Sequence, residues 1–229
     1  MTLRTRSPRG PRSPARSPRP RTEQRTRQLL LEAAGQVFAE KGFDRATGKE
    51  ICRRAGANAA AVNYHFGGID GLYAAVIWEA HSRFVTFDAL TAAIADKANP
   101  KAKLRAIFEL LVRTITGPVS SSWVLRVLGR EIVAPTRAIQ PLLKKEFLPK
   151  MRILKGIVGE LLGLTEDDPA VARGCLSVMA PCFLLLIGDR RIFRRALPSV
   201  FRFAPADVDA LVGHLVQFSL AGLSAVARR

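Results

Sequence analysis

A short segment of the chain carries side chains suited to contacting nucleic acid. Two asparagines and two alanines form a first set: Asn58, Ala59, Ala60 and Asn63. An asparagine amide can bond adenine through two hydrogen bonds, and an alanine can contact the methyl group of thymine. A second set offers hydroxyl, cationic, ring N–H and backbone N–H donors that suit phosphate oxygens. It comprises Thr47, Lys49, Arg53, Tyr64, His65 and Gly68. The first set would read bases, and the second would fix the position on the duplex.

Two short helices separated by a glycine must position these side chains. Thr47 and Glu50 have the spacing of a capping box, in which hydroxyl and carboxylate each satisfy a backbone donor. Gly56 ends this helix and gives the backbone freedom that a tight turn needs. Asn58 is a good N-cap for the next helix, which would end near the histidine seven residues later. The pattern predicts a helix-turn-helix over residues 47–66, with its second helix in the major groove.

The sequence around this motif resembles the N-terminal domain of the TetR family over roughly residues 23–84. The resemblance is carried by the run from Ala46 to Phe66, by the Ala-Ala-x-x-x-Phe-Ala-x-x-Gly-Phe pattern that ends at Phe43, and by Gly71-Leu72-Tyr73. The stretch from Asn58 to Gly67 is similar to the CecR-type subgroup, and Leu128-Gly129-Arg130-Glu131 with Pro135 matches that subgroup more loosely. Such a resemblance implies a homodimer, an all-α ligand-binding domain, and repression relieved by a small molecule.

One departure from the family pattern affects the expected DNA contacts. The turn after Phe66 usually reads Gly-Ser-Lys-Glu in the family, and here it reads Gly67-Gly68-Ile69-Asp70. The phosphate contact of that lysine is therefore not carried over to Ile69, and Gly68 is a backbone-only cap. We expect DNA affinity to depend more on Lys49, Arg53 or the basic arm described next.

The N-terminus, residues 1–21, is a basic arm. The chain has a net charge of +17, and residues 1–27 hold nine arginines and one glutamate. Arg-Ser-Pro recurs three times in the arm, which is too polar to bury a core and is expected to be disordered. It is either a solvated tail or a segment that follows phosphates or the minor groove. A general nucleic-acid-binding protein that uses this arm is the alternative function, although the arm lacks the aromatic residues on which single-stranded bases stack.

The remaining chain has a helical period throughout, so the predicted fold class is all-α. We expect a three-helix helix-turn-helix DNA-binding domain over residues 22–68 and a helical ligand-binding and dimerisation domain over residues 69–229. A fourth helix of about 18 residues, from Ile69 to Phe87, would connect them. Asp168 and Pro169 have the pattern of an N-cap followed by a first-turn proline, and Pro205 begins a further helix in the same way.

An effector pocket is expected in the middle of the second domain, where large apolar residues accompany an arginine: Phe84, Phe87, Phe108, Leu111, Trp123, Phe147 and Arg126. Glu131 is a further polar candidate, and each of these residues can equally be ordinary core. The family resemblance implies that helices near 169–187 and 205–226 pair with a second copy. Two reading helices would then lie about one DNA turn apart on a palindromic operator.

Several other functions are disfavoured. The three cysteines show no metal-binding or disulfide spacing, and no cofactor is expected. The longest apolar run, 175–187, has about 13 residues and contains Pro181, short of the roughly 20 that span a membrane. No signal peptide is recognisable, so a cytoplasmic location is expected. The three histidines are far apart, and no nucleophile motif or phosphate loop is present, which argues against an enzyme.

Overall fold

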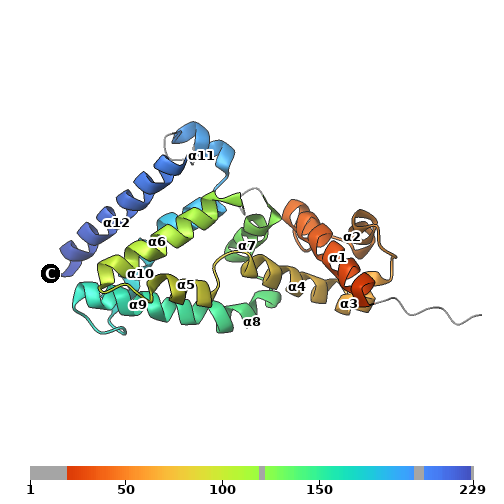
Figure 1. Cartoon of the computed structure of the whole chain (residues 1–229), viewed down its shortest axis with the longest axis horizontal. Coiled ribbons are helices and arrows are strands. Elements are labelled where there is room, and N and C mark those ends of the chain that lie inside the picture. The colour runs from red at the N-terminus through yellow and green to blue at the C-terminus, as the bar shows by residue number, and fades with distance from the viewer. Residues whose placement is uncertain (1–19, 119–121, 199–203, 228–229) are drawn as a thin grey trace, which may run out of the picture.

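The chain folds into helices, as the computed structural model in Figure 1 shows. Residues 20–118, 122–198 and 204–227 are described; of the predicted arm, residues 1–19 lie outside them. Within those ranges no strand occurs, and the all-α prediction is confirmed. The main helices are α1 (Pro20–Lys41), α2 (Gly48–Ala55), α3 (Ala61–Phe66), α4 (Ile69–Ser82), α5 (Phe87–Ile94), α6 (Pro100–Thr116), α7 (Trp123–Val133), α9 (Leu148–Leu162), α10 (Pro169–Ile187), α11 (Arg190–Ala196) and α12 (Pro205–Ala227).

Helices α1, α2 and α3 gather at one end of the molecule, on the right of Figure 1. Their shared core is built from the apolar stripe of α1, including Val37 and Phe38, and from Ile51 of α2 and Val62 of α3, all of which are buried. Burial of these side chains is the main favourable term that holds two such short helices in place. The three helices therefore form the predicted helix-turn-helix domain.

The connector between the two ends of the molecule is shorter than predicted. Helix α4 ends at Ser82, and α5 begins at Phe87, so one continuous helix across this region was a wrong prediction. The physical reason is local, because the Thr86 hydroxyl accepts the backbone N–H of Ala89 at 3.1 Å and caps a new helix. The apolar residues keep a helical spacing across this break, so the sequence pattern did not indicate where α4 ends.

The larger domain packs α6, α9, α10 and α12 against one another, with α5 alongside α6. Helix α10 begins where expected, since the Asp168 carboxylate accepts the backbone N–H of Ala170 at 2.7 Å and Pro169 follows. Between α7 and α9, a 3₁₀ turn (Arg137–Ile139), the short α8 (Gln140–Leu142) and a π-helical turn (Leu143–Phe147) lead directly into α9. The basic helix α11 had no counterpart in the sequence prediction.

Helices α10 and α12 leave much of their apolar surface uncovered in the single chain. Both are long and apolar enough to cross a membrane by length and composition, a criterion that core helices of soluble proteins also meet. Only 33% and 22% of the respective apolar stretches are buried. Large apolar side chains on them remain exposed, namely Leu176, Leu184, Ile187, Phe218 and Val226. Such a face is what a second protein surface would cover.

Candidate nucleic-acid interface and apolar cavity

The turn between α2 and α3 has the predicted local geometry. The Thr47 hydroxyl accepts the backbone N–H of Glu50 at 3.3 Å, as an N-cap does. Gly56 adopts a left-handed conformation with φ of 62°, and the N–H of Ala57 donates to the carbonyl of Cys52 at 2.9 Å. A glycine is suited to this position because other residues are strained at such a φ. The turn thus sets the crossing of the two helices.

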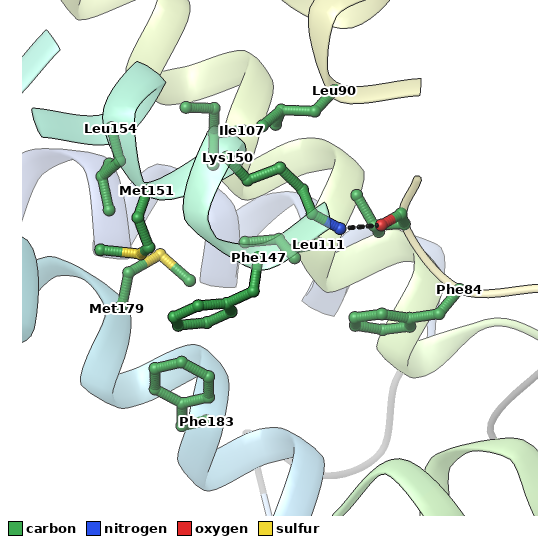
Figure 2. Close-up of a pocket in the computed structure, with 11 residues that line it drawn as sticks. Phe84, Leu90, Ile107, Leu111, Phe147, Lys150, Met151, Leu154, Met179 and Phe183 are labelled. Carbon is green, nitrogen blue, oxygen red and sulfur yellow. Dashed lines mark hydrogen bonds between the residues drawn. The ribbon is translucent and has the colours of Figure 1, made fainter. Parts of the chain in front are cut away.

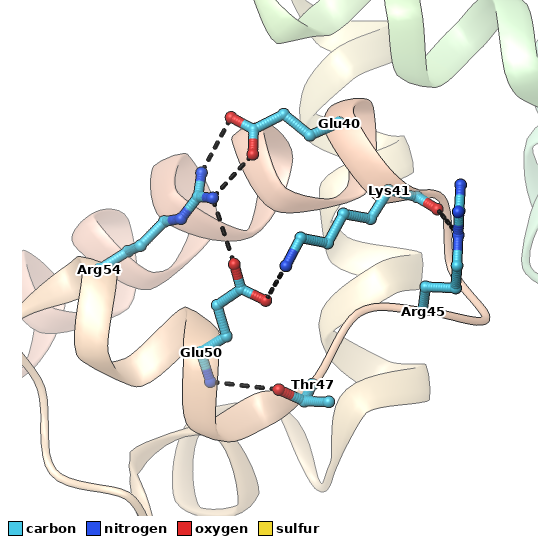
Figure 3. Close-up of polar contacts among 6 residues, drawn as sticks. All are labelled: Glu40, Lys41, Arg45, Thr47, Glu50 and Arg54. Atoms are coloured by element: carbon cyan, nitrogen blue, oxygen red, sulfur yellow. Dashed lines mark hydrogen bonds and ion pairs between the residues drawn. The ribbon is translucent and has the colours of Figure 1, made fainter.

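The carboxylate of Glu50 has a different role from the one predicted. Figure 3 shows that it accepts Lys41 Nζ at 2.7 Å and an Arg54 nitrogen at 3.2 Å, so the second half of the capping box was a wrong prediction. Arg54 also binds both carboxylate oxygens of Glu40, at 2.9 and 2.7 Å. Charged donors form stronger hydrogen bonds with a carboxylate than a neutral N–H does. Their hydrogen bonds lower the pKa values of Glu40 and Glu50 and tie α2 to α1.

Asn58, Ala59 and Ala60 form a turn before α3, which begins two residues later than expected. The side-chain oxygen of Asn58 accepts the N–H of Ala60 at 2.9 Å, and its backbone carbonyl accepts the N–H of Ala61 at 2.9 Å. Asn58 therefore caps a turn rather than the helix itself. Its amide oxygen is already engaged, whereas the side-chain amide of Asn63, which lies within α3, forms no hydrogen bond to the described residues.

All four candidate base-reading residues are exposed: Asn58, Ala59, Ala60 and Asn63. Among the candidate phosphate contacts, Thr47, Lys49 and Arg53 are exposed, whereas His65 and Gly68 are half-buried. Lys49 and Arg53 form no ion pair within the described ranges, so both charges remain available to an anionic partner.

Tyr64 is a strongly exposed candidate contact, with 72% of its surface accessible. Its hydroxyl donates to the carboxylate of Glu23 on α1 at 3.1 Å, and this hydrogen bond raises the pKa of Tyr64. A phosphate contact by Tyr64 would replace that bond. Nearby, the guanidinium of Arg27 lies 5.1 Å from the centre of the Phe66 ring. Sequence reasoning missed both Glu23 and Arg27, because neither is near α3 in the sequence.

The two domains are joined by a cluster of α1, α4 and α7 residues. The indole N–H of Trp123 donates to Glu32 at 2.8 Å, and Arg83 bonds the other oxygen of Glu32 at 3.2 Å. Arg83 also lies over the Trp123 ring, 5.2 Å from its centre. The ring packs so closely on Gly35 that a Cβ there would lie 2.3 Å from it. Trp123 is thus a domain-joining residue.

A second buried link involves Glu131, which sequence reasoning considered as a polar group of the pocket. Tyr73 of α4 donates its hydroxyl to Glu131 at 2.5 Å, and Thr136 donates its N–H and hydroxyl at 3.0 Å each. Burial raises the pKa of Tyr73 well above its usual range, so the hydroxyl stays a donor. These bonds occupy Glu131 in holding α4 against α7.

An apolar cavity of about 130 Å³ lies in the larger domain (Figure 2). It is enclosed by the α4–α5 turn and by α5, α6, α9, α10 and the π-helical turn. Its walls are Phe84, Val85, Leu90, Ile107, Leu111, Phe147, Lys150, Met151, Leu154, Met179 and Phe183. Ten of these eleven side chains are apolar, which suits an apolar ligand.

Three of the residues suggested for the pocket, Phe84, Leu111 and Phe147, line this cavity. Phe108 is fully buried in the core, and Phe87 begins α5. Arg126 is exposed and borders a different hollow, between α7 and the end of α10. Sequence reasoning missed the α9 and α10 residues of the cavity, although their spacing of three and four marks one face of each helix.

Lys150 is the one charged residue among the cavity walls, and three acceptors surround its amine. Nζ donates to the carbonyl of Val85 at 2.7 Å, as Figure 2 shows, and lies 2.8 Å from His81 Nε2 and 3.4 Å from Glu146. Glu146 also accepts the N–H of Phe87 at 2.7 Å. Burial, helped by the charge of Lys150, lowers the pKa of His81 to about 4, and burial lowers the pKa of Lys150.

The possible metal ligands and the cysteine thiols of the described residues lack what a metal site or a nucleophile requires. In the described part of the chain, no group of three or more histidine, cysteine, aspartate or glutamate side chains is placed to hold a metal ion. Cys52, Cys175 and Cys182 are buried and unpaired, and burial raises the pKa of Cys182 to about 12. A thiol held in its neutral form is a poor nucleophile.

Comparison with known proteins places both regions in described families. A family model described as bacterial regulatory proteins of the tetR family matches residues 30–76. The C-terminal domain model of the HTH-type transcriptional dual regulator CecR matches residues 100–223, more than half of the chain. No curated protein sequence matches the chain significantly.

Solved structures show the same fold at low sequence identity. The regulator FadR from Bacillus subtilis, in complex with stearoyl-CoA, has a TM-score of 0.62 and 16% identity, covering 85% of this chain and 98% of that one. A TetR-like regulator from Rhodococcus sp. RHA1 has a TM-score of 0.61 and 22% identity, covering 90% and 100%. The fatty acid degradation regulator FadR from Bacillus halodurans has a TM-score of 0.60 and 17% identity, covering 85% and 98%.

Proposed function

Because the chain belongs to the TetR family of bacterial regulatory proteins and carries a CecR-type C-terminal domain, we propose that it is a homodimeric repressor that a small apolar effector releases from a palindromic operator. Residues 22–68 bind DNA, and residues 69–229 bind the effector and the second copy. The observation that carries the proposal is the exposed helix-turn-helix with unpaired Lys49 and Arg53, on a domain joined by buried contacts to one that holds an apolar cavity.

In this proposal, α3 and the turn before it lie in the major groove. Asn63, with its free amide, and the exposed Ala59 and Ala60 contact base edges. Asn58 contributes only its amide N–H groups, because its oxygen caps the turn. Phosphates are bound by the remaining exposed or backbone donors, Thr47, Lys49, Arg53, Tyr64, His65 and Gly68.

The second copy covers the apolar face of α10 and α12. This assignment is supported by the exposure of Leu176 and Phe218 and by a groove between the two helices that Gly174 and Gly222 help to form. Two-fold pairing of this face buries apolar surface in both copies at once. It also fixes the spacing of the two α3 helices, which an operator with two half-sites requires.

In this proposal, DNA is released when the effector changes the contacts that join the two domains. Phe84 and Val85 line the cavity directly after Arg83, which binds Glu32 of α1. A ligand that moves this turn therefore pulls on α1 and, through α4, on α3. A ligand shifts the population of conformations only by its differential affinity for them, so the effector must bind the released conformation better. Stearoyl-CoA, bound to the B. subtilis FadR, is a far longer molecule than this cavity holds.

A binding titration tests the proposal. The protein, with and without residues 1–20, is titrated against DNA from upstream of its own gene and against a scrambled duplex. We expect a preference for the upstream DNA of about three decades or more in both forms of the protein. Equal affinity for the two duplexes, or a preference lost with residues 1–20, would instead favour a general nucleic-acid-binding protein.

A further inference from the structure

The cavity is small, and its shape is set largely by adaptable side chains. Its volume is about 130 Å³, close to the roughly 150 Å³ of an engineered apolar cavity, in another protein, that binds benzene. Met151 of α9 and Met179 of α10 both line it (Figure 2). Methionine side chains adjust to ligands of irregular shape because they are unbranched and flexible. Phe147 lines the cavity while 42% of its surface is exposed, so movement of this ring gives a path of entry.

The amine of Lys150 is already engaged by groups of the protein itself. An ammonium group has three N–H donors. Here the carbonyl of Val85, the Nε2 atom of His81 and the carboxylate of Glu146 lie at 2.7, 2.8 and 3.4 Å from Nζ. A ligand carboxylate would have to compete with these three groups for the amine. What Lys150 presents to the cavity is therefore its alkyl chain.

The charges beside the cavity also balance. Glu146 compensates Lys150, and its carboxylate lies 3.5 Å from His81 Nε2. His81 is neutral at physiological pH, since its pKa is about 4. An anion in the cavity would be attracted by Lys150 and repelled by Glu146, and the opposite holds for a cation. Because the two charges offset each other, neither kind of ion gains a net attraction that would compensate for the loss of its hydration.

We propose that the cavity takes a small uncharged apolar molecule about the size of one substituted aromatic ring, and that Glu146 is the residue that excludes anions. The inference rests on the proposed function only in calling this molecule the effector. Glu146 does not line the cavity, so it acts through Lys150 as a specificity-determining residue.

Three ligands that share one ring and differ in charge test the proposal, namely toluene, benzoate and benzylammonium. Binding to the full chain is measured by titration calorimetry at pH 7 without DNA. We expect toluene to bind at least 100-fold more tightly than either charged compound. Benzoate or benzylammonium binding as tightly as toluene would overturn the proposal, as would a failure of toluene to bind.

Glu146→Gln tests the role of the carboxylate. The glutamine oxygen can still accept the N–H of Phe87, while the negative charge is lost. We expect benzoate to bind at least tenfold more tightly than to the wild type, with toluene affinity changed by less than twofold. Glu160→Gln is the matched control, because Glu160 is an exposed glutamate of α9, the helix that follows the π-helical turn, and does not line the cavity. Equal benzoate affinity in Glu146→Gln and the control would refute the assignment.

Filling the cavity locates the binding site. Met179→Trp, or the smaller change Met151→Phe if the first variant does not fold, should abolish toluene binding. Unchanged binding in a folded filled variant would place toluene elsewhere and overturn the proposal.

Release of operator DNA by toluene is measured separately. Toluene that binds in the cavity without releasing DNA contradicts the proposed regulation and leaves the ligand class standing, whereas normal operator binding without any toluene binding contradicts the ligand class alone.

Discussion

Asn63 and Lys49 are both exposed, but we expect them to contribute differently to DNA binding. Asn63→Ala removes the one free amide of the reading helix and should weaken operator binding by about 1–3 kcal/mol, with no effect on a scrambled duplex. Lys49→Ala should weaken binding to both duplexes. It should also reduce, by about 1, the slope of the logarithm of the binding constant against the logarithm of the salt concentration. Fluorescence anisotropy at several salt concentrations separates the two. Unchanged discrimination by Asn63→Ala would remove this residue from base reading.

His81 makes the stability of the protein depend on pH. Its pKa falls from 6.5 to about 4 on folding, so below pH 6.5 the unfolded chain binds a proton that the folded chain does not. The contribution of His81 to the free energy of unfolding is therefore fully present above pH 6.5 and is lost as the pH falls toward 4. The loss should be about 2 kcal/mol at pH 5.

Urea unfolding at pH 7, 6 and 5 measures this effect in the wild type and in His81→Gln. The variant keeps an acceptor for Lys150 but cannot titrate, so its stability should fall less steeply over that range. Glu146 and Lys150, the charged groups that face His81, are present in both proteins. If the free energy of unfolding falls equally with pH in both proteins, folding does not hinder protonation of His81, and the prediction is wrong.

Sequence patterns predicted the residues whose partners are a few positions away. The caps at Thr47 and Asp168 and the turn at Gly56 are of this kind, because each bond closes within a few residues. Glu50 was assigned to its nearest backbone donor, whereas the fold brings Lys41 and Arg54 to it. Partners of charged side chains depend on tertiary packing, which local spacing does not contain.

At the scale of elements, the approach of α3 to α4 depends on Gly71. A Cβ at this position would lie 1.9 Å from the carbonyl oxygen of Phe66, so the two helices could not keep their present distance. Gly71→Ala should destabilise the protein by about 2 kcal/mol or more and weaken operator binding, because α3 must move. Thermal unfolding and operator titration measure the two effects.

Gly48→Ala is the control for that substitution. Gly48 is also in the first turn of a helix of the DNA-binding domain, and a Cβ there would meet nothing closer than 4.0 Å. Alanine is the better helix former, so we expect unchanged or slightly raised stability. Equal stability of Gly71→Ala and Gly48→Ala would contradict the close approach of α3 and α4.

Helix ends inside a continuing apolar pattern were the elements that sequence reasoning could not predict. The stripe that begins at Ile69 keeps its spacing through Phe84 and Phe87, and the break between them depends on the cap by Thr86. Threonine is common within helices as well as at their ends, so its presence alone decides little. By contrast, proline after aspartate at residues 168 and 169 gave a start that the structure confirms.

At the scale of the whole molecule, the exposed face of α10 and α12 should determine the oligomeric state. Phe218 is 71% exposed on this face, and Phe218→Glu should weaken dimerisation by about 30-fold or more by placing a charge in an apolar interface. Val133→Glu is the control, because Val133 is 70% exposed at the end of α7. Sedimentation velocity reports the dimer. A dimer equally stable in both variants would show that another face is used.

Whole-molecule features differed in how far the sequence revealed them. The helix-turn-helix is built from 20 or so consecutive residues, so its pattern could be read directly. The cavity collects residues from the turn after α4, from α5 and α6, and from α9 and α10. Phe108 and Trp123 are large aromatic residues in apolar segments, as Phe84 is, but they are buried elsewhere in the core. Only the packing of the helices decides which aromatic residue faces a cavity.

The π-helical turn at Leu143–Phe147 sets the angular phase of everything that follows it in α9. Each residue of an α-helix advances the side chains by about 100°, so deleting one residue here would turn Lys150, Met151 and Leu154 away from their present direction. Insertions or deletions at this one point could thus exchange the whole α9 contribution to the cavity without altering a single lining residue. Diversification of ligand preference among related chains would then leave its mark as a length change in a helix, where a comparison of aligned side chains would overlook it.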